Sequence, residues 1–338
     1  MNVTTIGIDL AKNVFQIHGV DADEQPVLRK RLSRNKLLPF FANLPPALIG
    51  IEACSSSNHW ARELQRLGHQ VRQISPQYVK PYVKSNKNDY NDAEAICEAV
   101  SRPGMRFVPT KSLTQQDIQA LHRVRERLVR DRTALVNQTR GLLREYGVFI
   151  PVGIRALRRQ IPEVLGNTHN QLTPLAREVV ADQYQRLREI DRHVIDYDRR
   201  IDSVFRNNEL CQRLTEVEGV GPLTATALVA AVGDANEFGN GRHLAAWLGL
   251  VPRQHSSGAR TRLLGISKRG NTYLRTLLIH GARSVVRRCG SNSDARGHWI
   301  QGIKTRRGFN RACVAVANKN ARILWALMAK AEPYRQAA

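Results

Sequence analysis

Apolar and polar residues alternate in short runs near the N-terminus. Runs at 3–9, 14–20 and 26–32 have the composition of strands, and the short turns between them favour an antiparallel meander. The pattern then predicts, in order, a helix at 33–43, a strand at 47–52, a helix at 57–67, a strand at 70–75 and a helix that begins near Asp92. We therefore predict an α/β domain over residues 1–110. Three antiparallel strands followed by alternating helices and strands is the order of an RNase H-like fold.

From about residue 113 to 146 the pattern is helical without interruption. Residues that recur at helical spacing there are Leu121, Val124, Leu128, Leu135, Thr139 and Leu142. A second helical run covers about 175–205, and Pro151, Pro162 and Gly166 indicate a turn region between the two. Two long antiparallel helices predict a coiled-coil arm over residues 111–208. Two helices of an ordinary bundle are the alternative.

A third, mainly helical part is predicted over residues 209–338. It begins with LTEVEGVGPLTATALVAAVG, in which Gly219 and Gly221 precede Pro222 at a helix start. This arrangement is similar to a helix-hairpin-helix, whose exposed backbone N–H groups bind phosphate oxygens. The basic, amphipathic tail from 291 to 338 is interpreted as a closing helix of this part.

Charge narrows the choice of partner. The chain has 52 Lys and Arg against 29 Asp and Glu, a formal net charge of +23, so nucleic acid is the first candidate partner and an anionic membrane surface the second. The membrane is disfavoured because no apolar run approaches the ~20 residues of a spanning helix, and no secretory signal precedes the first strand. The five cysteines form no C-x-x-C pair, which suits a reducing compartment. We predict a cytoplasmic nucleic-acid-binding protein.

Four carboxylates form the main candidate site. Asp9 and Glu52 each end an apolar strand, and neighbouring strand ends would bring them together. Asp89 and Asp92 lie at i and i+3, on one face of a helix that begins there. Taken alone, Asp89 and Asp92 are more simply explained as helix-capping residues or first-turn charges. Gathered together, the four would repel one another unless cations neutralise them, and oxygen-only ligands suit Mg²⁺ or Mn²⁺.

The motifs GIDLAK, GIEAC and KNDYNDAEA, followed by VEGVGPLTA, FGNGRHLAAWLGLVP, SSG and GISKRGNTYLR, carry a family resemblance. Over roughly residues 3–290 the chain resembles DEDD-type transposases of bacterial insertion sequences. These are RuvC-like, serine-containing recombinases described as RNA-guided bridge recombinases. The resemblance implies that Asp9, Glu52, Asp89 and Asp92 bind divalent metal and that the chain is a DNA transposase.

The resemblance also implies a serine nucleophile, here Ser257 in HSSGART, with Ser256 as its competitor. The serine would attack a scissile phosphate, form a 5′-phosphoserine intermediate and be displaced by a 3′-hydroxyl of the exchanged strand. Further implied partners are double-stranded donor and target DNA and a structured noncoding guide RNA. A homo-oligomer is also implied, a dimer that assembles to a tetramer. Location in a bacterial cytoplasm, with nucleoid association when bound to DNA, follows from the same resemblance.

From the residues alone, an SSG loop is more simply a flexible turn, and His255 beside it a solvated loop residue. Positive charge around the loop favours phosphate binding. The cations predicted to contact nucleic acid are Arg253, Arg260, Arg262, Lys268 and Arg269 near the serine, and Arg123, Arg127 and Arg130 on the arm.

Two other functions are compatible with these features. One is a RuvC-like, Mg²⁺-dependent, structure-selective endonuclease in which water cuts the strand and Ser257 is inert. The other is a non-catalytic nucleic-acid-binding protein. Four acids argue against the second, because a phosphate-binding surface would gain by losing them. The serine-containing part argues against the first, because a plain nuclease does not need it.

Overall fold

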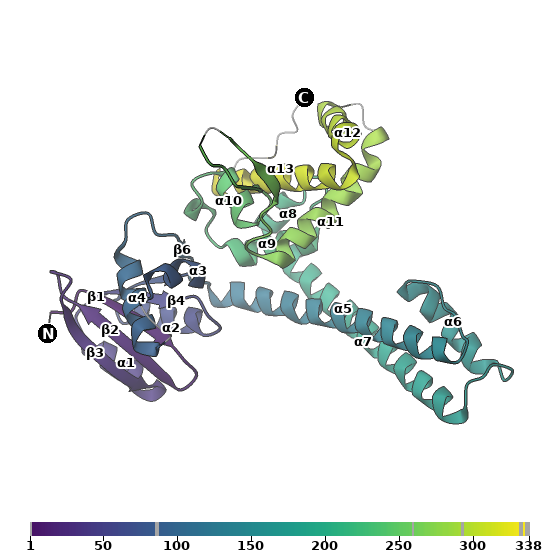
Figure 1. The fold of residues 1–338 in the computed structure, drawn as a ribbon, viewed down its shortest axis with the longest axis horizontal. Coiled ribbons are helices and arrows are strands. Elements are labelled where there is room, and N and C mark those ends of the chain that lie inside the picture. Colours follow the sequence, from purple (N-terminus) through teal and green to yellow (C-terminus); the bar gives the residue numbers. More distant parts are fainter. Residues whose placement is uncertain (1, 85–87, 259, 292–293, 331–333, 335–338) are drawn as a thin grey trace. The chain divides into compact units, whose positions relative to one another are not determined.

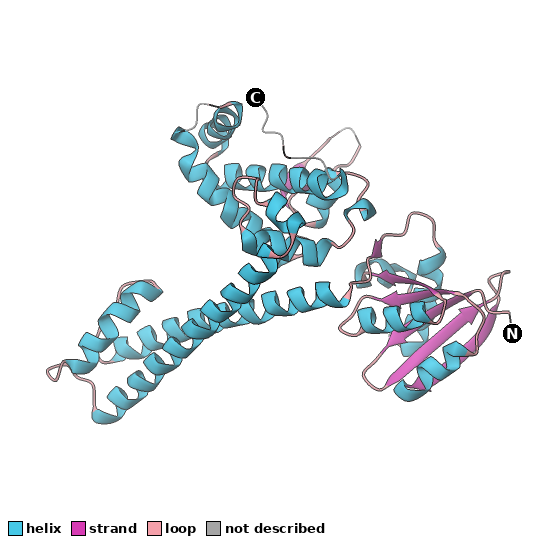
Figure 2. Cartoon of the chain, turned by 180° about the vertical axis from the view of Figure 1, so that it is seen from behind, coloured by secondary structure: helices cyan, strands magenta, loops and turns pink. Residues whose placement is uncertain are grey.

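The computed structural model describes residues 2–84, 88–258, 260–291, 294–330 and 334, and the fold below refers to these. The chain divides into two compact units, residues 1–112 and 113–338 (Figure 1). The first unit is mixed α/β and the second is mostly helical (Figure 2). The prediction of α/β followed by all-α structure is confirmed at this level. Asn86 and Lys87 of the predicted acidic stretch lie outside the described residues.

The first unit is built on one mixed sheet with the strand order β3-β2-β1-β4-β5-β6. Its strands are β1 (Thr5–Leu10), β2 (Val14–Val20), β3 (Pro26–Ser33), β4 (Leu48–Glu52), β5 (Gln70–Ile74) and β6 (Phe107–Val108). Its helices are α1 (Leu37–Ala42), α2 (Ser57–Arg66), α3 (Pro76–Val79) and α4 (Asp89–Ser101), with short 3-10 turns at Arg34–Lys36 and Lys80–Tyr82. β1 to β3 pair antiparallel, whereas β1, β4 and β5 are parallel, so the carboxyl ends of β1 and β4 meet at one edge.

Strand alternation separates the two faces of the sheet. Ile6 and Ile8 of β1 pack with α1 and α2 in one hydrophobic core. On the other face, Ile96 of α4 packs with Ile74 of β5 in a second, smaller core. Asp9 follows Ile8 and therefore belongs to the α4 face.

Glycines on the α4 face let this helix lie close to the sheet. A Cβ atom on Gly7 would overlap with the backbone of Ala93 and Cys97, and one on Gly50 would lie 2.9 Å from the Cβ atom of Val100. Larger residues at these positions would push the helix away from the strands. The close approach brings the start of α4 to the strand ends where Asp9 lies.

The second unit begins with two long helices that pack side by side, with a shorter helix at their far end (Figure 1). They are α5 (Leu113–Glu145), α6 (Ile154–Gly166) and α7 (Pro174–Arg206). Ion pairs fix the antiparallel register of α5 and α7: Arg125 pairs with Asp198, and Arg132 with Asp191 at 3.3 Å. The second pair lies seven residues further along α5 and seven back along α7, which is one heptad in each direction.

Two details of the predicted arm are wrong. The predicted turn region contains α6, with Pro162 inside the helix; Leu157 and Ile161 are buried there, and their burial outweighs the missing proline hydrogen bond. In α5, two residues of the predicted apolar spacing are exposed, Val124 at 41% and Leu142 at 39%. Leu143 is buried in place of the neighbouring Leu142. Both are leucines, so the sequence pattern did not distinguish them.

The rest of the second unit packs around one large hydrophobic core. Its helices are α8 (Glu209–Leu214), α9 (Pro222–Val232), α10 (Gly241–Trp247), α11 (Thr272–Arg288), α12 (Ala295–Arg307) and α13 (Phe309–Lys330), with 3-10 turns at Ala235–Glu237 and Cys289–Ser291. A hairpin of β7 (Pro252–Gln254) and β8 (Leu263–Ile266) extends from this core. Within the described ranges, no helix combines the length and apolarity that crossing a membrane requires.

A buried polar cluster joins α5 to α9 and α11. His122 lies 3.0 Å from the Tyr273 hydroxyl through Nδ1 and 3.0 Å from the Thr226 hydroxyl through Nε2. The Thr226 hydroxyl donates to the Pro222 carbonyl at 2.8 Å, so its oxygen accepts from Nε2–H of a neutral imidazole. Burial, and to a smaller extent nearby Arg125, lower the pKa of His122 from 6.5 to about 4.

This lowered pKa predicts a pH-dependent stability. Because the folded protein favours the neutral ring, the stabilisation is complete above about pH 6.5 and is lost as the pH falls towards about 4. The shift corresponds to roughly 3 kcal/mol in the free energy of unfolding. Urea unfolding followed by circular dichroism should show that the stability difference between the native protein and His122→Gln shrinks from pH 7 to pH 4.5. His169→Gln, at an exposed position of the arm, is the control; parallel pH curves for the native protein and His122→Gln would contradict the assignment.

Candidate functional site

The carboxyl end of β1 lies at the centre of the candidate site. Asp9 is paired with Gln16 of β2, and Glu52 follows the last pair of the β1–β4 ladder, Ile8 with Ile51. Residues directly across from each other in a sheet point to the same face. Gln16, Asp9 and Glu52 therefore form one row across the sheet, on the face that α4 covers.

The start of α4 supplies the other two acids. Asn88 is the N-cap residue, and its side-chain oxygen accepts from the backbone N–H of Tyr90 at 3.1 Å. Asp89 and Asp92 occupy the first turn, where the helix dipole favours negative charge. The capping role is thus filled by Asn88, and the two carboxylates of the first turn remain available for other contacts.

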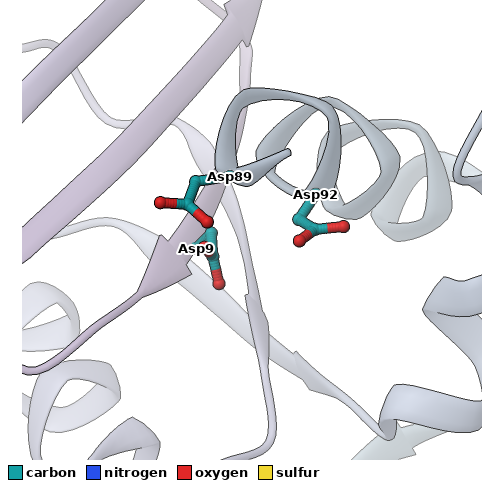
Figure 3. A group of neighbouring side chains, drawn as sticks. All are labelled: Asp9, Asp89 and Asp92. Carbon is teal, nitrogen blue, oxygen red and sulfur yellow. The ribbon is translucent and has the colours of Figure 1, made fainter. Parts of the chain in front are cut away.

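Three of the four predicted acids come together. Carboxylate oxygens of Asp9, Asp89 and Asp92 all lie within 4.8 Å of one another, and the three side chains converge beside the first turn of α4 (Figure 3). Asp9 and Asp92 are half-buried and Asp89 is exposed. Glu52 is half-buried and is not a member of this group in the structure, although its strand position is adjacent to Asp9.

Gln16 is a neighbour of this group that sequence reasoning missed. It is 6% exposed, and its Oε1 atom has no hydrogen-bond partner in the described part of the chain. A buried amide oxygen without a partner is costly, and a bound cation or a hydrogen-bond donor that contacts this oxygen would remove the cost. Gln16 and His18 alternate with apolar residues in the run VFQIHGV, so the sequence alone did not single out Gln16.

The donor set fits a hard divalent cation. Three carboxylates so close together repel one another, and a cation between them relieves the repulsion. All the candidate ligands are oxygens, which suit Mg²⁺ and Mn²⁺ better than softer metals.

Ser257 lies on the β7–β8 hairpin, in the second unit. It is exposed, and it forms a β-bridge with Arg260, whose N–H donates to the Ser257 carbonyl at 3.2 Å. No partner of its hydroxyl is found among the described residues. The hydroxyl of Ser256 instead accepts from Gln254 Nε2 at 3.0 Å and from the Arg262 N–H at 3.3 Å. Ser256 therefore stabilises the hairpin, and Ser257 presents its hydroxyl to solvent.

The predicted cations of this region are all exposed: Arg253, Arg260, Arg262, Lys268 and Arg269. Hydrogen bonds tie the loop that carries the last two to the helical core: the Arg275 guanidinium donates to the carbonyls of Leu248 and Arg269 at 3.0 and 3.1 Å. On the arm, Arg123, Arg127 and Arg130 are exposed as well. Arg127 pairs with Asp131 and Arg130 with Glu126, one turn apart on the same helix.

The two glycines of the predicted helix-hairpin-helix differ in their surroundings. Gly219 has a φ of +84° and packs against the backbone of Gly281 in α11, so a close helix approach requires it. A Cβ atom on Gly221 would meet open space, and this residue caps α9. Gly219 thus has a packing role, whereas Gly221 leaves the start of α9 accessible.

Comparison with known proteins gives matches over nearly the whole chain. A model of DEDD transposases of the IS110 type matches residues 6–148, and the model described as Transposase IS116/IS110/IS902 family matches residues 211–298. The first range contains all four predicted acids and the second contains Ser257.

Individual relatives match over nearly their full length. The chain is 53% identical to a probable family 20 transposase of Pseudomonas aeruginosa, with 99% of each chain covered. It is 47% identical to the transposase for insertion sequence element IS1111A of Coxiella burnetii, covering 99% of this chain and 92% of the relative. It is 42% identical to the transposase for IS1328 of Yersinia enterocolitica, with 96% of each covered.

Similarity of this extent defines the class of protein: the chain is a transposase, an enzyme that cuts and rejoins DNA. Within that class it belongs to the IS116/IS110/IS902 family of insertion-sequence transposases. The predicted family and enzyme class are confirmed. Membership of the DEDD type indicates use of a divalent metal, in agreement with the acidic cluster.

Proposed function

We propose that this transposase exchanges DNA strands through Ser257 and a divalent metal held by Asp9, Asp89 and Asp92, with Glu52 as a fourth ligand. The observation that carries the proposal is the convergence of the three aspartates from a strand end and a helix start. The strand order and the helix on each face support an RNase H-like, RuvC-like fold for the first unit. Gln16, beside Asp9, offers a further oxygen ligand or a partner for metal-bound water.

In the proposed reaction, one phosphoester bond forms for each one that breaks, so no external energy source is needed. Ser257 Oγ attacks the scissile phosphorus, a serine–phosphate bond forms, and the bond to the 3′-oxygen breaks as that oxygen takes a proton. A 3′-hydroxyl of the other strand then attacks the same phosphorus and releases the serine. Mg²⁺ or Mn²⁺, when bound, would stabilise negative charge on the phosphate and the leaving oxygen. The exposed arginines of the hairpin would hold the phosphate near Ser257.

Partners follow from the family resemblance and the charge. Double-stranded donor and target DNA are the substrates, and the net charge of +23 suits such polyanions. A structured noncoding guide RNA and assembly from dimer to tetramer are part of the same proposal. We further propose that phosphate groups bind at Gly221, Arg123, Arg127 and Arg130. The proposed location is the cytoplasm, on the nucleoid when the protein is bound to DNA.

A second function is a metal-dependent endonuclease in which water replaces the serine. The observation in its favour is that the acidic cluster is formed within one unit, from β1 and α4 alone. A hydrolytic enzyme would leave free 5′-phosphate ends and form no bond between protein and DNA.

The test is a cleavage assay on DNA that contains the element's junction. The protein is purified from cells that carry the whole element, together with any nucleic acid that copurifies. We expect cleaved and rejoined products with Mg²⁺ or Mn²⁺, and their complete loss after chelation, because the phosphate charge is then left unstabilised. Gel analysis of end-labelled strands measures both products. Rejoined products that persist in chelator would exclude the metal role, and cleaved 5′-phosphate ends without joining would favour the endonuclease.

A further inference from the structure

A large groove crosses the surface of the second unit outside the sites described so far. It has a volume of about 1070 Å³ and lies between α10, α13, the base of the β7–β8 hairpin and Trp299 of α12. α10 and the hairpin lie beside α13 in Figure 1. Most of one wall is α13, which lies beyond residue 298, where the match to the transposase family model ends.

The charge on this groove is of one sign. The charged residues that line it are Arg242, Arg311, Lys319, Arg322 and Lys330. None of these five makes an ion pair with a described residue, and no aspartate or glutamate of the described chain is among the lining residues. Some exposed arginines of the same unit are neutralised by an acid one turn away, as Arg127 is by Asp131. The unneutralised charge therefore points to an anionic partner.

The floor of the groove is apolar and aromatic. Between the cations, α13 exposes Val314, Ala315 and Ile323 to the groove. Trp299 is half-buried and lies beneath the Lys319 ammonium group, 4.5 Å from its ring centroid. Trp325 of α13 also lines the groove, and its indole N–H donates to the carbonyls of Ala235 and Phe238 at 3.0 Å each.

These features distinguish between forms of nucleic acid. A duplex presents phosphates on a rigid cylinder and keeps its bases stacked inside, so it makes no use of an apolar, aromatic floor. A single strand presents phosphates and unstacked bases together, and proteins that bind it combine a cationic groove with aromatic side chains. DNA is the polyanion that the enzyme class acts on, and strand exchange separates its strands. We infer that the groove between α10 and α13 binds a segment of single-stranded DNA.

Two sets of variants test this inference in the full-length chain. Arg311→Glu/Arg322→Glu removes two proposed phosphate contacts from the groove. Arg186→Glu/Arg188→Glu makes the same change in net charge on α7, where both arginines are exposed and form no ion pair with a described residue. Trp299→Ala removes the aromatic surface, and Trp299→Phe keeps it. Circular dichroism verifies that each variant is folded.

Fluorescence anisotropy without divalent metal measures binding to a labelled single strand, to the duplex of the same sequence and to the matching RNA strand. For single-stranded DNA the groove variant should bind at least roughly tenfold more weakly than the α7 control. The slope of log affinity against log salt should fall by about 1.4, which corresponds to two lost phosphate contacts. Trp299→Ala should also weaken binding roughly tenfold, whereas Trp299→Phe restores most of it.

Three results would overturn the inference: equal losses in the groove and control variants, an equal loss for the duplex, or a loss confined to the RNA strand. The measurement requires neither cleavage nor metal. It therefore remains informative even where the proposed roles of Ser257 and the acidic cluster prove wrong.

Discussion

Replacing Asp9 with asparagine is expected to lower DNA strand cleavage by roughly a hundredfold to a thousandfold without weakening DNA binding. Asparagine has nearly the same shape but removes one negative charge from the group of three carboxylates. The divalent cation then loses a charged ligand, and the phosphate loses charge stabilisation. Cleavage of end-labelled junction DNA measures the rate, and anisotropy measures binding.

Asp23→Asn is the matched control, because this exposed residue of the same unit undergoes the same change of charge in the turn between β2 and β3. It should cleave at the native rate. Asp92→Asn and Glu52→Gln should lose activity as Asp9→Asn does. Native activity in Glu52→Gln would limit the metal site to the three aspartates that the structure brings together.

Metal binding also has a readout that is independent of cleavage. A cation that binds only the folded protein stabilises it, by about 3 kcal/mol at a hundredfold excess over its Kd. The native protein and Asp23→Asn should therefore unfold at a higher temperature when Mg²⁺ is added, and Asp9→Asn should not. Without metal, Asp9→Asn should be at least as stable as the native protein, because repulsion among the carboxylates is relieved. A large loss of stability without metal would instead mean that Asp9 has a structural role.

The elements of the first unit could be predicted because their information is local. Alternation along 3–9 and 14–20 identifies strands, and the sheet order places the end of β1 beside β4. Asp9 was singled out because a carboxylate at the end of an apolar strand has few simple structural uses. Asp89 and Asp92 have a simple use as charges at a helix start, and they joined the candidate site only through Asp9 and Glu52. The partial exception is Glu52: the register places its backbone correctly, but the direction of its side chain depends on packing that one sequence does not show.

Features that depend on distant contacts were missed. Pro162 predicts a turn from local sequence, but the structure contains a helix there because Leu157 and Ile161 are buried by residues distant in the sequence. The groove on α13 requires Arg242, far away in the sequence, to lie opposite Arg322, and no local pattern encodes that pairing. Gln16 becomes notable only when its neighbour across the sheet is known to be Asp9.

Ser257→Ala is expected to abolish both the covalent protein–DNA adduct and strand joining, with a loss of roughly ten-thousandfold or more. The exposed Ser257 hydroxyl is the proposed nucleophile, and alanine removes it without disturbing the β-bridge to Arg260, which uses backbone atoms. Denaturing gel electrophoresis of the protein with labelled junction DNA and Mg²⁺ measures the adduct.

Ser256→Ala separates the nucleophile from a general effect on the hairpin. Its hydroxyl accepts from Gln254 and from the Arg262 backbone, so its loss loosens the turn and should lower the rate of adduct formation only several-fold. An adduct that persists in Ser257→Ala but disappears in Ser256→Ala would move the nucleophile by one residue. Full cleavage by Ser257→Ala with no adduct in the native protein would assign the attack to water. The three aspartates would then serve hydrolysis, and rejoining would require a second reaction that forms the new phosphodiester bond.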